Sequence, residues 1–168
     1  ARKDVWVAAG EFTISTALNI VDSVNVYGSF AGTETTVAAR SKVANGKAWE
    51  FVNPTTLKGS GARLFQAVGN MDMETIIDGF ILRDGNGVGS TISASGGAAV
   101  ARGNVVYQNC IMRNNAASGS GSGGAIIMTG GTVRYCLFEN NTQSGGANGG
   151  GAIFTNPAAG FPVKIENC

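Results

Sequence analysis

A tetrapeptide built on two glycines recurs in the second half of the chain at a fixed interval of 27 residues. It reads Gly-Gly-Ala-Ala at 96–99 and Gly-Gly-Ala-Ile at 123–126 and 150–153. A second motif keeps nearly the same step, because CIMRNN at 110–115 returns 26 residues later as CLFENN at 136–141. A repeat of this length is typical of a solenoid, in which each unit buries its apolar face only by stacking on the next unit.

The amino-acid composition argues against several classes of protein and several kinds of binding partner. The 168 residues include 26 glycines but only 3 prolines, which argues against collagen and against a proline-rich disordered linker. Charged residues make up 14% of the chain and the net charge is +1, so we expect no nucleic acid as a partner. The apolar runs are too short to span a bilayer, which predicts no membrane insertion by this segment. Histidine is absent, which removes the commonest general base and the usual imidazole ligand.

Short runs of alternating apolar and polar residues predict strands through most of the chain. From 75 to 168 the units are regular, and each contains three such runs separated by turns. We therefore predict an all-β fold, a single-stranded parallel β-helix (solenoid) with three short strands per coil and about five coils, in one domain over 1–168. Residues 33–54 break this pattern and end at Pro54, which predicts an inserted loop with one helical turn.

The alternation also predicts which side chains face the interior. If Cys110 points inward, Met112 does so too, and Cys136 and Phe138 take the same places in the next unit. Parallel stacking at about 4.8 Å then produces two interior columns. They consist of Phe80, Cys110, Cys136 and Cys168, and of Leu82, Met112 and Phe138.

The three cysteines share one column position, and their number is odd. Their Cα–Cβ bonds are expected to run parallel about 4.8 Å apart, whereas the Cβ atoms of a disulfide lie about 3.5–4.5 Å apart. Buried free thiols that act as small apolar side chains are therefore favoured over a disulfide. A metal or redox role is a weaker alternative, because no Cys-x-x-Cys spacing occurs.

Asn115 and Asn141 occupy matching turn positions, with Gly85 at that place one unit earlier. Asn tolerates a left-handed backbone, and its amide can bond the backbone of its own turn. Stacked amides can also bond one another. We predict that these asparagines, with the cysteines, Met112 and Phe138, form a structural ladder.

Acidic residues are the candidates for catalysis, and they form no familiar constellation. Glycoside hydrolysis requires two carboxyl groups about 5–9.5 Å apart. Asp72 and Glu74 share a face of an extended segment without a third partner, and Asp78 is predicted to cap a turn. Asp84 beside Arg83 supplies one carboxylate, whereas calcium takes about 6–8 oxygen ligands. We therefore assign no catalytic, cofactor-binding or metal-binding residue.

The motifs resemble the polymorphic outer membrane protein repeat, which is defined by Gly-Gly-Ala-Ile/Leu/Val and Phe-x-x-Asn. The copies at 123–126, 150–153 and 138–141 match in full, whereas 96–99 ends in Ala. The N-terminal part, 5–35, resembles the opening of large secreted β-helix proteins of Bacteroidota-type bacteria. The resemblance implies a right-handed parallel β-helix that is secreted or on the bacterial cell surface. Such proteins include adhesins, autotransporter passengers, type IX secretion cargo and some carbohydrate-active enzymes.

Two functions are compatible with these features. The first is a non-catalytic adhesin or stalk segment that is exported across the outer membrane and has surface glycans as partners, with Trp6 and Trp49 as candidate sugar platforms. The alternative is the N-terminal part of a polysaccharide lyase or glycoside hydrolase whose groove lies beyond Cys168. Because the chain stops there on a strand, we expect a longer protein, with further coils or another chain at that end. The secretion machinery is a further expected partner.

Overall fold

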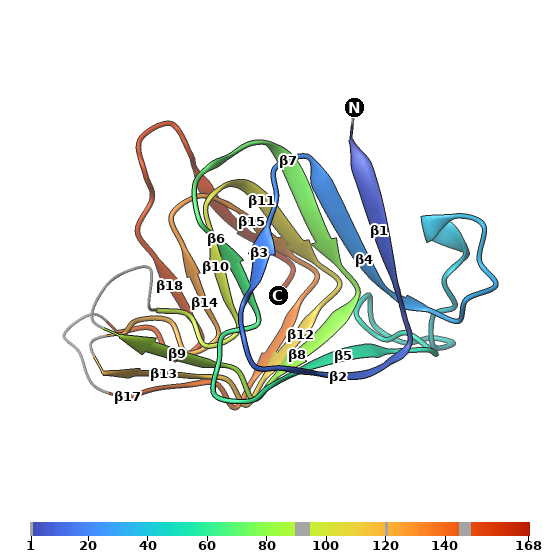
Figure 1. Ribbon diagram of the computed structural model, residues 1–168, viewed down its shortest axis with the longest axis horizontal. Coiled ribbons are helices and arrows are strands. Elements are labelled where there is room, and N and C mark those ends of the chain that lie inside the picture. The colour runs from blue at the N-terminus through green and yellow to red at the C-terminus, as the bar shows by residue number, and fades with distance from the viewer. Residues whose placement is uncertain (1, 90–94, 120, 145–148) are drawn as a thin grey trace.

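The structure is a computed structural model that describes residues 2–89, 95–119, 121–144 and 149–168 (Figure 1). Its strands form four parallel sheets, here called sheets A to D, in which neighbouring strands come from successive turns of the chain. Within the described ranges the only helical element is a single 3-10 turn, η1 (Val37–Ala39). No helix in those ranges is long and apolar enough to cross a membrane.

Each sheet collects one strand from every turn that contributes to it. Sheet A contains β1 (Lys3–Ala8), β4 (Val24–Phe30), β7 (Met71–Asp78), β11 (Gly103–Gln108), β15 (Gly131–Arg134) and β19 (Val163–Glu166). Sheet B contains β2 (Gly10–Ile14), β5 (Thr55–Gly59), β8 (Phe80–Arg83), β12 (Ile111–Arg113) and β16 (Leu137–Glu139). Sheet C contains β3 (Leu18–Ile20), β6 (Phe65–Ala67), β10 (Ala99–Ala101), β14 (Ile126–Met128) and β18 (Ile153–Thr155). Sheet D contains β9 (Asn86–Gly89), β13 (Ala116–Gly119) and β17 (Thr142–Ser144).

The chain visits the sheets in a fixed order, which is consistent with a parallel β-helix or solenoid. Strands β1, β2 and β3 lie in sheets A, B and C, and β4, β5 and β6 repeat that order. The next three turns add a strand of sheet D between sheets B and C. The prediction of three strands per coil is therefore right for the first two turns and wrong for the next three, which have four. The described residues complete five turns, and β19 begins a sixth.

In each of the three turns that contain a sheet-D strand, a residue with a left-handed backbone follows the sheet-B strand. This residue accounts for the additional strand. Asp84, Asn114 and Asn140 have φ angles of +56°, +54° and +52°. This conformation turns the chain sharply, so the following segments from successive turns meet and pair as β9, β13 and β17. Those segments consist mostly of small or polar residues, and the alternation that predicts the other strands is missing from them.

The predicted inserted loop lies between β4 and β5 and projects from the side of the sheets (Figure 1). It contains η1, in agreement with the predicted helical turn, and an antiparallel bridge between Lys42 and Phe51. Strands β2 and β5 pair directly despite the long segment between them. The insertion therefore leaves the stacking of the turns uninterrupted.

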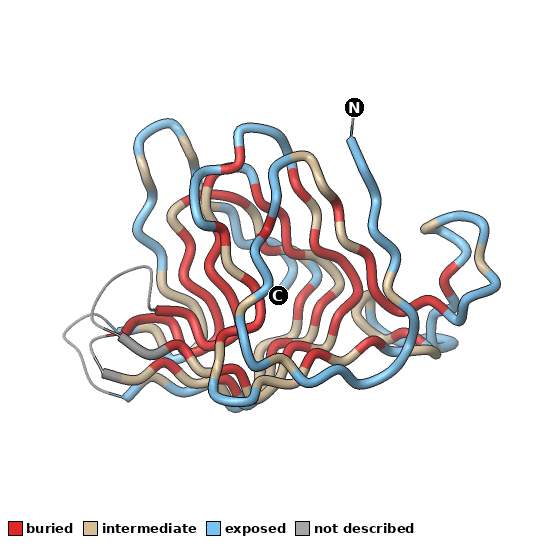
Figure 2. The backbone as a smooth tube through the Cα atoms, in the orientation of Figure 1, coloured by how far each residue is buried: buried red, intermediate tan, exposed pale blue. Residues whose placement is uncertain are grey.

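The core runs along the inside of the middle turns (Figure 2). Leu64, Ile77, Leu82, Val105 and Ile126 are all completely buried. Each such side chain contributes about 1.5–3 kcal/mol relative to an exposed one, so stability increases turn by turn. Strands β1 and β19, at the two ends, are mostly exposed.

The glycine pairs mark the place where the chain enters sheet C. The first glycine of each pair has a left-handed backbone, with φ of +77° at Gly96, +71° at Gly123 and +101° at Gly150. The second glycine of the first two pairs packs against the neighbouring turn, since a β-carbon on Gly97 would lie 2.3 Å from the carbonyl oxygen of Gly124, and one on Gly124 would lie 2.0 Å from that of Gly151. The first glycine is required for its conformation and for space, because a β-carbon on Gly123 would lie 2.3 Å from the carbonyl oxygen of Ile126, whereas the second glycine of these two pairs is required for space alone.

Replacing the second glycine tests this tight approach. We expect Gly124→Ala to lower the free energy of unfolding by about 1–3 kcal/mol, because the new methyl group forces the backbones of two turns apart. Gly69→Ala is the matched control: its β-carbon would meet nothing within 4 Å, and the φ of Gly69 is not left-handed. Urea unfolding followed by circular dichroism measures both variants. Equal stability of the two would contradict the proposed packing.

Candidate functional site

The cysteines lie just after the bend between sheets A and B, and they repeat one bonding pattern. Cys110 and Cys136 are completely buried, and all three thiols are free. The single S–H proton of each thiol lies within reach of two acceptors, the carbonyl two residues earlier and a carbonyl of the preceding turn. The acceptors are Gln108 (3.1 Å) and Ile77 (3.8 Å) for Cys110, Arg134 (3.3 Å) and Tyr107 (3.7 Å) for Cys136, and Glu166 (3.3 Å) and Val133 (3.8 Å) for Cys168. The column is thus held by the backbone as well as by packing.

Cys168 departs from the prediction of three buried thiols, because it is exposed. No described strand lies over it, whereas Cys110 has Cys136 in the next turn. Hydrogen bonds with Cys110 and Cys168, together with burial, raise the pKa of the Cys136 thiol. The hydrogen bond from Cys136 lowers the pKa of Cys168 below its ordinary value. The exposed thiol is therefore the reactive one of the three.

The second interior column follows the same stacking. Strand β12 pairs with β8 and β16 so that Met112 lies between Leu82 and Phe138. Leu82 and Met112 are completely buried, whereas Phe138 is half-buried and packs against the edge of the core. These residues fill the interior and offer no polar atom to a ligand.

Asn115 and Asn141 form an amide ladder that crosses the turns. The completely buried Asn115 donates from Nδ2 to the carbonyl of Leu82 and to Oδ1 of Asn141, both at 3.0 Å. Its own Oδ1 accepts from the backbone N–H of Gly85 at 2.9 Å. Asn141 repeats the pattern, donating to the carbonyl of Met112 at 2.8 Å. Each amide therefore satisfies a backbone group of the preceding turn.

The left-handed backbone predicted at these asparagines belongs to the residue before each of them. Asn114 and Asn140 adopt it, so the side chains of Asn115 and Asn141 are turned toward the interior. Gly85 fits the same place without a side chain: a β-carbon there would lie 2.9 Å from Oδ1 of Asn115. The amide of one turn thus occupies the space that the glycine of the preceding turn leaves.

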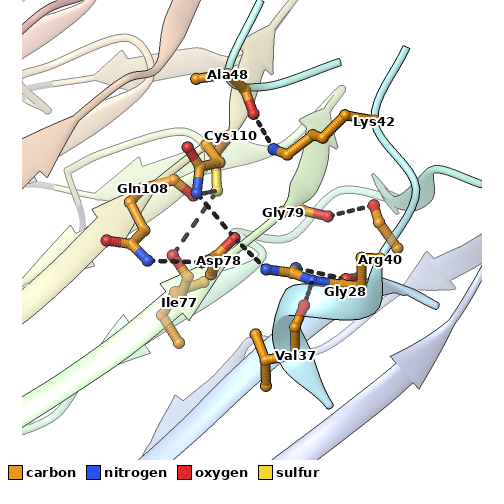
Figure 3. Close-up of polar contacts among 12 residues, drawn as sticks. Gly28, Val37, Arg40, Lys42, Ala48, Ile77, Asp78, Gly79, Gln108 and Cys110 are labelled. Carbon is orange, nitrogen blue, oxygen red and sulfur yellow. Dashed lines mark hydrogen bonds and ion pairs between the residues drawn. The ribbon is translucent and has the colours of Figure 1, made fainter. Parts of the chain in front are cut away.

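A buried ion pair joins the inserted loop to sheet A (Figure 3). Arg40, from the loop, contacts Oδ1 of Asp78 at 3.1 Å and donates to the carbonyl of Gly28 at 2.8 Å. Its guanidinium also lies over the rings of Tyr27, Phe30 and Phe51, with centroid distances of 5.7, 5.4 and 4.8 Å. Asp78 was predicted to cap a turn, and instead it binds this arginine.

Asp78 also begins a polar column on the outer face of sheet A. Gln108 donates to Oδ2 of Asp78 at 2.6 Å, and Arg134 donates to Oε1 of Gln108 at 2.9 and 2.6 Å. These three residues are in register on adjacent strands. With its oxygens already accepting from Arg40 and Gln108, the carboxylate of Asp78 serves structure rather than acid–base chemistry.

Two of the other candidate carboxylates, Glu74 and Asp84, have partners of their own. Glu74 lies 3.5 Å from Arg2, and Asp84 pairs with Arg83, which also contacts Glu11 at 2.8 Å. Within the described residues, no three acidic, cysteine or histidine side chains lie close enough together to hold a metal ion. The structure does not gather these groups into one site.

Of the two candidate sugar platforms, Trp6 is the more clearly defined. Its ring stacks on Phe30 with the centroids 4.6 Å apart and the planes 10° from parallel. It is 42% exposed on β1, on the face opposite Val5 and Val7, which line an apolar opening of about 350 Å³ that Trp6 does not line. Trp49 is half-buried in the inserted loop. The two aromatic residues lie on different parts of the chain and share no pocket that the structure describes.

Sequence reasoning missed three arginines with structural or surface roles. Arg40 and Arg63 are buried, and Arg102 lies between two surface depressions beside sheet C. The sequence did contain a signal for Arg63 and Arg102, since Arg63 directly precedes a buried apolar run and Arg102 directly follows one, at 99–101. Because the chain has few charged residues, a charge beside a buried strand indicates a residue with a specific structural or surface role.

Comparisons with known proteins identify no relative, because no protein-family model, no curated protein and no solved structure matches the chain.

The amide ladder makes a specific prediction for stability. Asn115→Ala removes, at a completely buried position, the acceptor of the Gly85 N–H and the donor to the Leu82 carbonyl. We expect the free energy of unfolding to fall by about 2–4 kcal/mol in urea titrations, since each buried polar group left without a hydrogen-bond partner costs about 1–3 kcal/mol. Asn104→Ala, at an exposed residue with one backbone bond, is the control and should cost under about 1 kcal/mol. A loss at Asn115 no larger than at Asn104 would refute the ladder.

The cysteine column predicts selective alkylation. Iodoacetamide at neutral pH should modify Cys168 alone in the folded chain, because that thiol is exposed and its lowered pKa increases the thiolate fraction. Cys110 and Cys136 should react only after unfolding in urea. Mass spectrometry of peptides before and after unfolding measures each site. Modification of Cys110 at the rate of Cys168 would be incompatible with a buried column.

Proposed function

We propose that this chain is a segment of a right-handed, single-stranded parallel β-helix that acts as a non-catalytic scaffold, as an adhesin or a stalk. The observation that carries the proposal is the position of the repeated residues. Cys110 and Cys136 are buried, Asn115 bonds the preceding turn, and Gly124 presses against the next one. Repetition in this sequence thus stabilises stacking and imposes no constant chemistry on the outer surface.

The outer residues vary where the inner residues repeat. Lys58, Arg83, Arg113 and Glu139 occupy equivalent positions on adjacent strands of sheet B, and the charge along them changes sign. Stacking therefore does not require one kind of charge at this outer position of sheet B, so turns can be added and can carry different side chains there. Those two properties suit a stalk or an adhesin.

The resemblance of the tetrapeptides to the polymorphic outer membrane protein repeat supports a location outside the cell or on the bacterial surface. Export would then cross the outer membrane, as an autotransporter passenger or as cargo of type IX secretion. The partners under this proposal are the secretion machinery, surface glycans, and further coils or another chain beside β19. Lys164, Ile165 and Glu166 of β19 are exposed, and an exposed strand edge accepts another strand.

A polysaccharide panel tests the non-catalytic part of the proposal. Incubation of the purified chain with neutral and acidic polysaccharides should release no new reducing ends and no unsaturated products, while a glycan array should detect binding. Asp72→Asn and Glu74→Gln are the control variants for catalysis. Product release by the parent chain that either substitution abolishes would contradict the proposal and favour a carbohydrate-active enzyme.

A further inference from the structure

The thiols of Cys136 and Cys168 lie at equivalent places in two successive turns, at the β19 end of the cysteine column. Each cysteine follows by two residues one member of an in-register pair, Arg134 on β15 and Glu166 on β19. Each sulfur atom also lies 3.3 Å from the carbonyl oxygen of that residue. Adjacent strands are about 4.8 Å apart, so the two sulfur atoms are separated by about that distance. The two thiols also interact with each other.

This separation suits a bridging metal ion better than a disulfide. The sulfur atoms of a disulfide lie about 2.05 Å apart, so a covalent bond would have to pull the two turns together. A bond between a thiolate and a metal ion such as zinc is about 2.3 Å long, so two such bonds in line span about 4.6 Å. An ion that takes two ligands in line can therefore lie between Cys136 and Cys168 without moving the backbone.

The number and the kind of ligands determine which cation fits. A structural zinc ion takes four ligands, whereas among the described residues no three cysteine, histidine or acidic side chains gather around one point. Calcium and magnesium take oxygen ligands in larger number. Thiolates select soft cations such as Cu(I), whose closed electron shell makes two ligands in line a stable arrangement. A pair of stacked thiols thus matches a soft, two-coordinate ion.

The surroundings of the two sulfur atoms favour a positive ion. The carbonyl oxygen of Tyr107 lies 3.7 Å from Sγ of Cys136, and that of Val133 lies 3.8 Å from Sγ of Cys168. The carboxylate of Glu166 adds a negative charge near Cys168. Carbonyl oxygens carry partial negative charge, and here they face the thiol protons. A cation that replaces those protons faces the same oxygens.

Access distinguishes this pair from the other pair of stacked thiols. Cys168 is exposed, and Cys136, one turn below it, is completely buried. Cys110 and Phe80 take the same place in the two preceding turns, and both are buried. An ion that arrives from solvent therefore meets Cys168 first and then Cys136, whereas both members of the Cys110–Cys136 pair are covered.

We propose that Cys136 and Cys168 bind a soft monovalent cation of the Cu(I) type in a linear, two-coordinate site at the β19 end of the thiol column. On binding, two S–H bonds break, two bonds from sulfur to the metal form, and two protons leave to solvent. Neither the sulfur atoms nor the ion change oxidation state. The resulting complex carries one negative charge, which remains in contact with water on the exposed side of Cys168. The inference is independent of the scaffold function.

Metal titration of the full, reduced chain under anaerobic conditions tests the proposal. Cu(I) in competition with the chromogenic chelator bicinchoninate should bind with a stoichiometry of one ion per chain. Ag(I), which has the same coordination preference and is inert to redox change, should protect Cys168 from iodoacetamide. Zn(II) in excess should do neither, because the pair lacks the four ligands that zinc takes. Absence of Cu(I) binding, or protection by Zn(II) equal to that by Ag(I), would overturn the site.

Serine variants localise the ion. Loss of a residue that only supports a metal ligand already weakens binding about 10–100-fold, so Cys168→Ser and Cys136→Ser should each weaken Cu(I) binding by more than about a hundredfold. Cys110→Ser is the matched control, because that thiol belongs to the same column and bonds the backbone in the same way. It should bind Cu(I) as the parent does. Cys168→Ser changes an exposed residue, so the test stands even where a buried substitution impairs folding.

Three other results would each overturn a site between these two turns. Full affinity in Cys136→Ser would assign the ion to Cys168 alone. A loss in Cys110→Ser equal to that in Cys168→Ser would require a different set of ligands. A dimer that forms on addition of Cu(I), seen by size-exclusion chromatography and retained in Cys136→Ser, would show that the ion bridges Cys168 of two copies. All three would leave the scaffold function standing.

Discussion

In-register hydrogen bonding between the backbones of successive turns is the constraint on which the rest of the structure depends. Parallel strands place each residue beside its counterpart one turn away, as Met112 lies beside Leu82 and Phe138. A side chain that fits the interior once must therefore fit again in the next turn. The apolar column, the thiol column and the amide ladder are three consequences of this one spacing.

The same spacing determines where polar groups can be buried. At the bends the strand ladders are interrupted, and side chains from the neighbouring turn complete the bonding, as Asn115 does for Gly85 and Cys136 does for Tyr107. The inserted loop is joined differently, because it does not stack. Arg40 reaches from it to Asp78 through a buried, fully hydrogen-bonded ion pair, so loss of either partner would leave an uncompensated charge.

Much of the architecture could be predicted from the sequence because its signals are local and repeated. The 27-residue interval and the period-2 alternation predicted an all-β fold with parallel sheets, and both are present. Sheet D was missed because β9, β13 and β17 have little apolar alternation to reveal them. The exposure of Cys168 depends on what lies above it, which the residue pattern does not encode.

The surface features could not be predicted for a different reason. Arg40 and Asp78 are 38 residues apart, and Arg63 and Arg102 lie in different turns, so their proximity arises only when the turns stack. Each arginine looks like an isolated charge in the sequence. The register of the stack, rather than any motif, brings these residues together, and a one-residue slip would separate them.

Nuclear Overhauser spectroscopy of the 17.1 kDa chain tests that register most directly. In-register stacking predicts backbone contacts between α and amide protons of Leu82 and Met112, and again between those of Met112 and Phe138, in the pattern of parallel strands. It also predicts contacts from the Met112 methyl group to both of its column neighbours. Contacts that pair Met112 with residues of another register, or an antiparallel pattern between these strands, would show that the turns do not stack in this register.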